Sequence, residues 1–130
     1  MGNLSDTQKA LAQLRQDKMV RAFRERAKGG ALVPPTAEQW QRLTELFAES
    51  LPQAYAIIGQ EGLLIQQELL TAIITLLDFT NAEVATLLEN TPQRVTNLKA
   101  AANGKLFADA SATTLKSNFI AQMNENVQKV

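Results

Sequence analysis

The side chains in this chain that are suited to chemistry are amides, hydroxyls and cations. The sequence contains no cysteine and no histidine, which excludes disulfides, thiolate zinc sites, thiol catalysis and the Ser-His-Asp triad. Glu45 and Glu49 lie four residues apart on one predicted helix, but no partner acid, base or metal ligand accompanies them, which indicates a solvated face. We therefore expect neither an enzyme nor a metal or cofactor site.

Positive charge collects in one short segment of the second half of the chain. Pro92–Phe107 contains three basic residues and no acid, whereas Asp78–Thr91 contains three acids and no basic residue. The basic residues are Arg94, Lys99 and Lys105. A cationic segment that also carries amides at Gln93 and Asn97 indicates nucleic-acid contact, because a side-chain amide can pair bidentately with adenine.

The elements around these residues have the pattern of a helix-turn-helix. A long apolar helix is predicted over Gln66–Asp78, and a short helix capped by Asn81 follows it. Thr91 is a good N-cap and the proline after it is a favoured first helical residue, so a third helix is predicted over Pro92–Asn103. Asn103-Gly104 is expected to end that helix.

The turn between the second and third helices determines how the third helix would meet DNA. Glu89 and Asn90 occupy this turn, and asparagine is a residue that tolerates the left-handed conformation. Ala85 is small enough for the third helix to cross the second closely, and Val95 packs back from the third. The backbone N–H groups from Thr91 to Arg94 would then face the major groove.

The run from Leu69 to Phe107 resembles a family of DNA-binding domains. Its sequence is LLTAIITLLDFTNAEVATLLENTPQRVTNLKAAANGKLF. It is similar to the helix-turn-helix of LuxR-type and sigma-factor region 4-type transcription regulators, in the variety found as a bacterial C-terminal effector domain. The similarity is carried by Phe79–Leu88, by Thr91–Leu98 and by the trailing Asn-Gly-Lys-Leu-Phe, and it extends loosely upstream to the helix over Thr36–Phe47.

This resemblance implies a site for double-stranded DNA on the third helix. The residues implied to contact base edges are Thr91, Gln93, Thr96 and Asn97. The residues implied to contact phosphates are Arg94, Lys99 and Lys105. Alanines at 100–102 stand where relatives commonly carry Arg or Lys, so we expect weak DNA binding by a monomer.

Of three functional classes, an enzyme is the one that the sequence supports least, because histidine, cysteine and a clustered polar site are absent, and two others remain. One is a cytoplasmic DNA-binding transcriptional regulator that acts as a homodimer. The other is a helical adaptor that has lost DNA binding and uses its helix-turn-helix for protein–protein contact or dimerisation. Retention on DNA that falls steeply with salt distinguishes them. The longest apolar stretches are far short of a membrane span, and the N-terminus lacks the apolar core of a secretory signal.

The beginning of the chain differs from the rest in charge. Met1–Val33 has seven basic and three acidic residues, a net +4, and the remainder carries a net −4. Residues 1–30 are predicted to form a basic arm with one helix over Ser5–Lys28 that mediates homodimerisation. The apolar stripe of this helix consists of Leu11, Leu14, Val20 and Phe23. A basic face that either follows a phosphate backbone or is simply solvated consists of Arg21, Arg24 and Lys28.

Residues 31–130 are predicted to form one all-α domain, because no segment alternates between apolar and polar residues with a period of two. Thr36 and Gln39 have the spacing of a capping box. A short helix is expected over 54–58, and the last helix is expected to be capped near 111–113. The predicted core consists of Trp40, Leu43, Phe47, Leu70, Ile73, Ile74, Leu77, Ala85, Leu88, Val95, Leu98, Phe107 and Phe119.

Overall fold

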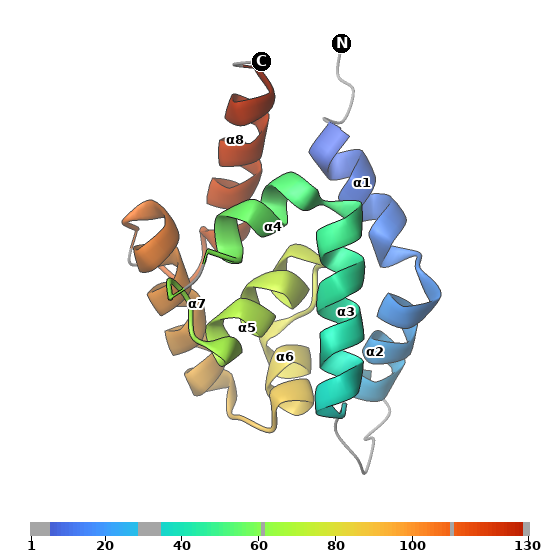
Figure 1. The fold of residues 1–130 in the computed structure, drawn as a ribbon. Coiled ribbons are helices and arrows are strands. Elements are labelled where there is room, and N and C mark those ends of the chain that lie inside the picture. Colours follow the sequence, from blue (N-terminus) through green and yellow to red (C-terminus); the bar gives the residue numbers. More distant parts are fainter. Residues whose placement is uncertain (1–5, 29–34, 61, 110, 129–130) are drawn as a thin grey trace.

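The part of the chain that the structure describes is built entirely of helices. The computed structural model describes residues 6–28, 35–60, 62–109 and 111–128. The helices in order are α1 (Asp6–Arg15), α2 (Lys18–Lys28), α3 (Ala37–Ser50), α4 (Pro52–Ile58), α5 (Gln66–Leu76), α6 (Asn81–Leu88), α7 (Pro92–Phe107) and α8 (Leu115–Gln128) (Figure 1). No strand occurs within those ranges, and the all-α prediction is confirmed.

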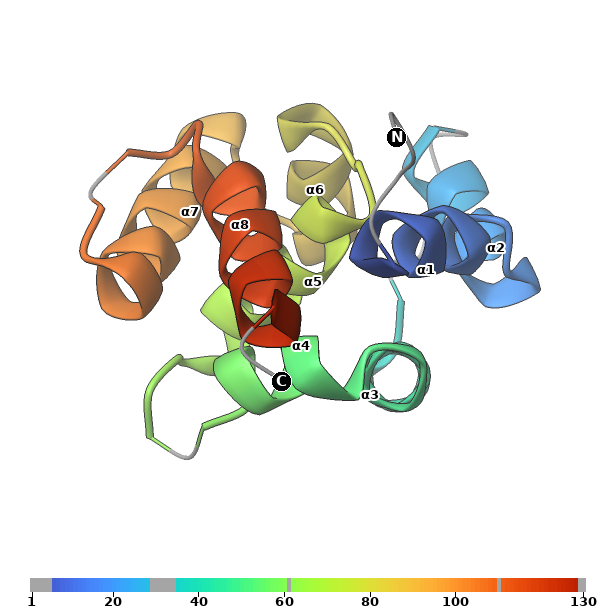
Figure 2. The same cartoon turned by 90° about the horizontal axis from the view of Figure 1, so that it is seen from above.

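Helix α5 lies at the centre of the fold. Seen from above in Figure 2, α5 and α6 lie between α7 and α8 on one side and α1 and α2 on the other. Every residue of 71–77 is buried, as the wide apolar surface of this segment predicts. Of the thirteen predicted core residues, eleven are buried, while Leu88 and Phe107 are half-buried and pack against the core.

Local capping sequences determine where two of the helices begin. The Thr36 hydroxyl accepts from the Gln39 N–H at 3.1 Å and the Gln39 side chain accepts from the Thr36 N–H at 2.8 Å, which confirms the predicted capping box. Helix α6 is capped by Thr80 and not, as predicted, by Asn81. Thr80 and Glu83 form a second reciprocal box, which satisfies two backbone donors where a lone Asn81 cap would satisfy one.

The predicted single helix over Ser5–Lys28 is wrong, because the structure has two helices, α1 and α2, in this part of the chain. Ser5 itself lies outside the described residues. The Asp17 carboxylate accepts from the Met19 N–H at 2.8 Å and so caps the start of α2. This break resets the helical register between Leu14 and Val20, where the apolar spacing slips.

The apolar stripe of α1 and α2 packs inside the protein. Leu11, Leu14, Val20 and Phe23 are buried and belong to the same core cluster as residues of α3 and α5. The rings of Phe23 and Trp40 meet edge to face, with centroids 5.1 Å apart. The surface that we expected to supply a homodimer contact is therefore covered by the chain's own helices.

Helix α7 extends beyond its predicted end. It passes through Asn103-Gly104 and continues to Phe107. The Asn103 side chain is buried, and its amide donates to the Ser111 carbonyl at 2.7 Å and to the Thr114 hydroxyl at 3.0 Å. Because this amide binds the loop before α8 and does not compete for the backbone of its own helix, the helix is not ended there.

Replacing Ala85 with leucine is expected to lower the free energy of unfolding by about 1–3 kcal/mol, because extra methylene groups overpack a filled core. Ala85 is buried on α6, which packs against α2 and α7. Urea denaturation measures the change. Ala82→Leu is the matched control, since Ala82 is exposed on the same helix, and equal stability of the two variants would contradict this packing.

Candidate nucleic-acid interface

Helices α6 and α7 are joined by a three-residue turn, and both pack against α5. The left-handed residue of this turn is Glu89, with φ 56°. Glu89 is the C-cap of α6, and its conformation directs the Asn90 N–H back to the Ala85 carbonyl at 2.9 Å. The Ala85 carbonyl, at the end of α6, thereby has a hydrogen-bond donor, and α7 begins after the three-residue turn.

The first two turns of α7 are exposed on one face. The Thr91 hydroxyl accepts from the Arg94 N–H at 3.1 Å and caps the helix. Gln93, Arg94 and Asn97 are exposed, and the Gln93 amide donates to Asn97 Oδ1 at 3.2 Å. The opposite face is buried at Val95. Two amides and one guanidinium thus project from a helix that is held by its other face.

Three further predicted DNA contacts are engaged by neighbouring helices. Thr96 is half-buried and its hydroxyl accepts from Asn81 Nδ2 at 3.4 Å. Lys99 Nζ donates to Asn81 Oδ1, and burial lowers the pKa of Lys99. Lys105 forms an ion pair with the buried carboxylate of Glu68, with 2.6 Å between Nζ and Oε1. The predicted residues that share the exposed start of α7 are Thr91, Gln93, Arg94 and Asn97.

Beyond Asn97, α7 carries small residues and two cations, Lys99 and Lys105, that already have partners within the chain. Ala100 and Ala101 are half-buried, and Gly104 is exposed. Among the residues described, Arg94 is the one basic residue of α7 without a side-chain partner. Each phosphate contact adds to affinity and to its salt dependence, so this helix alone offers little electrostatic attraction.

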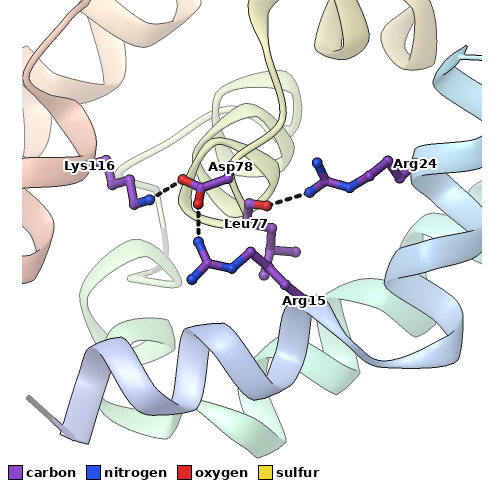
Figure 3. A network of polar contacts seen from close by, with 5 residues as sticks. All are labelled: Arg15, Arg24, Leu77, Asp78 and Lys116. Atoms are coloured by element: carbon purple, nitrogen blue, oxygen red, sulfur yellow. Dashed lines mark hydrogen bonds and ion pairs between the residues drawn. The ribbon is translucent and has the colours of Figure 1, made fainter. Parts of the chain in front are cut away.

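Asp78, at the turn between α5 and α6, gathers cations from distant parts of the chain (Figure 3). Arg15 from α1 and Lys116 from α8 pair with its two carboxylate oxygens. Arg24 from α2 donates to the neighbouring Leu77 carbonyl at 2.8 Å. These partners lie 38 to 63 positions apart in sequence, so no local pattern could have predicted the cluster.

The predicted basic face of α2 is divided by these contacts. The Arg24 guanidinium is directed to the α5–α6 turn and lies 4.5 Å from the centroid of the Phe79 ring. Arg21 and Lys28 are exposed. Two of the three predicted cations on this face therefore remain at the surface.

Within the described residues, no three carboxylates gather closely enough to hold a metal ion. None of the described helices is long and apolar enough to cross a membrane. No family model, curated protein or solved structure matches the chain.

Proposed function

We propose that this chain binds double-stranded DNA as a cytoplasmic transcriptional regulator, with the start of α7 in the major groove. The observation that carries the proposal is the exposed set Gln93, Arg94 and Asn97 on a helix whose other face is buried against the core. A helix-turn-helix reads the major groove with residues near the N-terminal end of its recognition helix, which corresponds here to α7.

Each exposed side chain has a role that fits its chemistry. The amides of Gln93 and Asn97 pair with adenine edges, and they lie close enough to bond each other in the absence of DNA. The Arg94 guanidinium contacts phosphate, as do backbone N–H groups at the start of α7. Because α7 supplies a single unpartnered cation, the monomer binds weakly.

We also propose that the protein acts on DNA as a homodimer, since two symmetric half-sites are the usual way a helix-turn-helix gains affinity. Leu11, Leu14, Val20 and Phe23 are buried. A dimer contact through α1 or α2 therefore uses their exposed faces, which include Arg21 and Lys28.

Gln93→Ala is expected to weaken binding to a preferred site by about 1–3 kcal/mol and to leave random duplex unaffected. Arg94→Ala is expected to weaken both alike and to reduce the salt slope by about one. The preferred site is selected from a random duplex pool, and affinity is measured by fluorescence anisotropy across a salt series. Gln53→Ala is the control, since Gln53 is exposed on α4. Equal effects of the two glutamine substitutions would contradict the assignment.

One observation favours the helical adaptor as the second candidate function. Lys99 and Lys105, two of the three cations of α7, are already bound to side chains of α6 and α5. A helix whose cations contact its own neighbours is suited to packing. A complete absence of duplex binding at low salt would reject DNA binding and favour the adaptor.

A further inference from the structure

An open cationic hollow lies where α1 and α2 meet the turn between α5 and α6. Its volume is about 350 Å³, which is within the range of small-molecule sites. The residues that line it are Arg15, Gln16, Arg21, Arg24 and Asp78. Three arginines and one carboxylate thus share this space, and none of the contacts proposed above for DNA uses it.

The one carboxylate of the hollow does not neutralise its arginines. One oxygen of Asp78 is paired with Arg15 and the other with Lys116 of α8, as Figure 3 shows. Its single negative charge is therefore already shared by two cations. Arg21 and Arg24 form no ion pair with any described residue. The three arginines and one aspartate of the lining leave a surplus of two positive charges.

Arg24 is held in a fixed position beside the hollow by neutral groups. Its Nη2 donates to the Leu77 carbonyl at 2.8 Å, and its guanidinium lies 4.5 Å from the centroid of the Phe79 ring. These contacts orient the guanidinium but bring no negative charge to it. A guanidinium has five N–H donors, and the hydrogen bond to Leu77 uses one of them. Other donors of Arg24 are therefore available to a ligand.

Arg21 supplies a second guanidinium to the same hollow. It lies three residues before Arg24 on α2, so the two side chains lie on one face of that helix. Arg21 is exposed, and its side chain has no partner in the described part of the chain. The acids within four residues of it are Asp17 and Glu25, and neither lines the hollow. A ligand that reaches Arg24 therefore also meets a free cation.

We propose that this hollow binds a small ligand through a phosphate monoester group, held by Arg21 and Arg24 with Arg15 beside them. A guanidinium pairs with two phosphate oxygens at once, which makes arginine well suited to this group. A phosphate monoester carries roughly −1.5 to −2 charges near neutral pH, which fits the surplus of the lining. A phosphate of a nucleic-acid backbone carries about one. Binding here does not rest on the proposed DNA contacts, which belong to α7.

The test is a titration of the full chain with methyl phosphate, a monoester, followed by amide NMR shifts. Sodium chloride at equal ionic strength is the reference. Saturable shifts are expected at the amides of Gln16, Arg21, Arg24 and Asp78. Shifts that sodium chloride reproduces would overturn the proposal, because screening of surface charge would then account for them.

Arg21→Met is expected to weaken the affinity for methyl phosphate about tenfold, the usual effect of losing a hydrogen bond to a charged group. Because the Arg21 side chain is exposed and holds no described residue, this variant is expected to fold normally. Lys18→Met is the matched control, since it removes a charge from an exposed position of α2 that does not line the hollow. Equal affinities of the two variants would overturn the proposal, because net charge alone would then explain the attraction.

Arg21 also lies on the face of α2 that we propose for the homodimer contact. The mass of both variants is therefore measured by light scattering with and without methyl phosphate. We expect Arg21→Met to bind methyl phosphate more weakly at an unchanged mass. A loss of affinity that is accompanied by a change of mass, and is absent when the mass is unchanged, would overturn the proposal in favour of a role in assembly.

Two further arms identify the source of the phosphate. Dimethyl phosphate is the matching diester with one negative charge fewer, and it is expected to bind about tenfold more weakly than methyl phosphate. A short duplex is expected to leave the shifts caused by methyl phosphate in place. Equal binding of the diester, or displacement of methyl phosphate by the duplex, would assign the hollow to a nucleic-acid backbone and overturn the small-ligand proposal.

Discussion

Phe23→Ala is expected to lower the free energy of unfolding by about 3–5 kcal/mol, the range for truncating a buried aromatic side chain. Phe23 is 6% exposed. Its ring packs edge to face on Trp40, with centroids 5.1 Å apart, and α2 as a whole packs against α6. The substitution removes both the buried apolar area and the ring contact, so a large part of the stability of a domain of this size is lost.

This experiment distinguishes two roles for α2: a helix that is part of the core of the protein, and an arm that mediates dimerisation. Unfolding is followed by urea denaturation, and the mass is followed by light scattering in the absence of denaturant. Arg21→Ala, at an exposed position of the same helix, is expected to change stability by no more than about 0.5 kcal/mol. Unchanged stability of Phe23→Ala together with a lower mass would return this residue to a role in dimerisation.

Asn103→Ala is expected to lower the free energy of unfolding by about 2–4 kcal/mol, because truncation removes three hydrogen bonds of a buried amide. The Asn103 side chain is fully buried within α7. Its amide donates to the Ser111 carbonyl and the Thr114 hydroxyl, and its Oδ1 accepts from Asn118 Nδ2 at 3.0 Å. One side chain therefore joins α7, the loop after it and α8.

The matched control for Asn103 is Asn97→Ala, the same substitution at an exposed position of the same helix. It is expected to change stability by about 0.5 kcal/mol or less, although it removes an amide that we assign to DNA. Thermal and urea unfolding measure both variants. If Asn103→Ala lowers the free energy of unfolding no more than the control does, the hydrogen bonds of the Asn103 side chain make no net contribution to stability.

Several signals that act within one or two helical turns were predicted correctly from the sequence, although the Thr80–Glu83 capping box was not. The reciprocal bonds of Thr36 and Gln39 need partners only three residues apart, and Thr91 followed by proline opens α7 as expected. The apolar surface of α5 was too wide for an exposed helix, so its central place also followed from composition. These features depend on short-range geometry, which residue type and spacing determine directly.

The sequence by itself determined that the protein is all-α, that α5 is buried and that α7 begins after a three-residue turn with an exposed polar face. The tertiary structure decided which charges are already paired within the chain. A count of three cations on α7 is the same whether Lys105 has no partner or, as here, pairs with Glu68, a residue 37 positions earlier. The tertiary structure also decided that α7 passes through Asn103, because the groups that bind the Asn103 amide come from a later loop. Helical periodicity predicts which residues share a face, but the packing of other helices determines what covers that face.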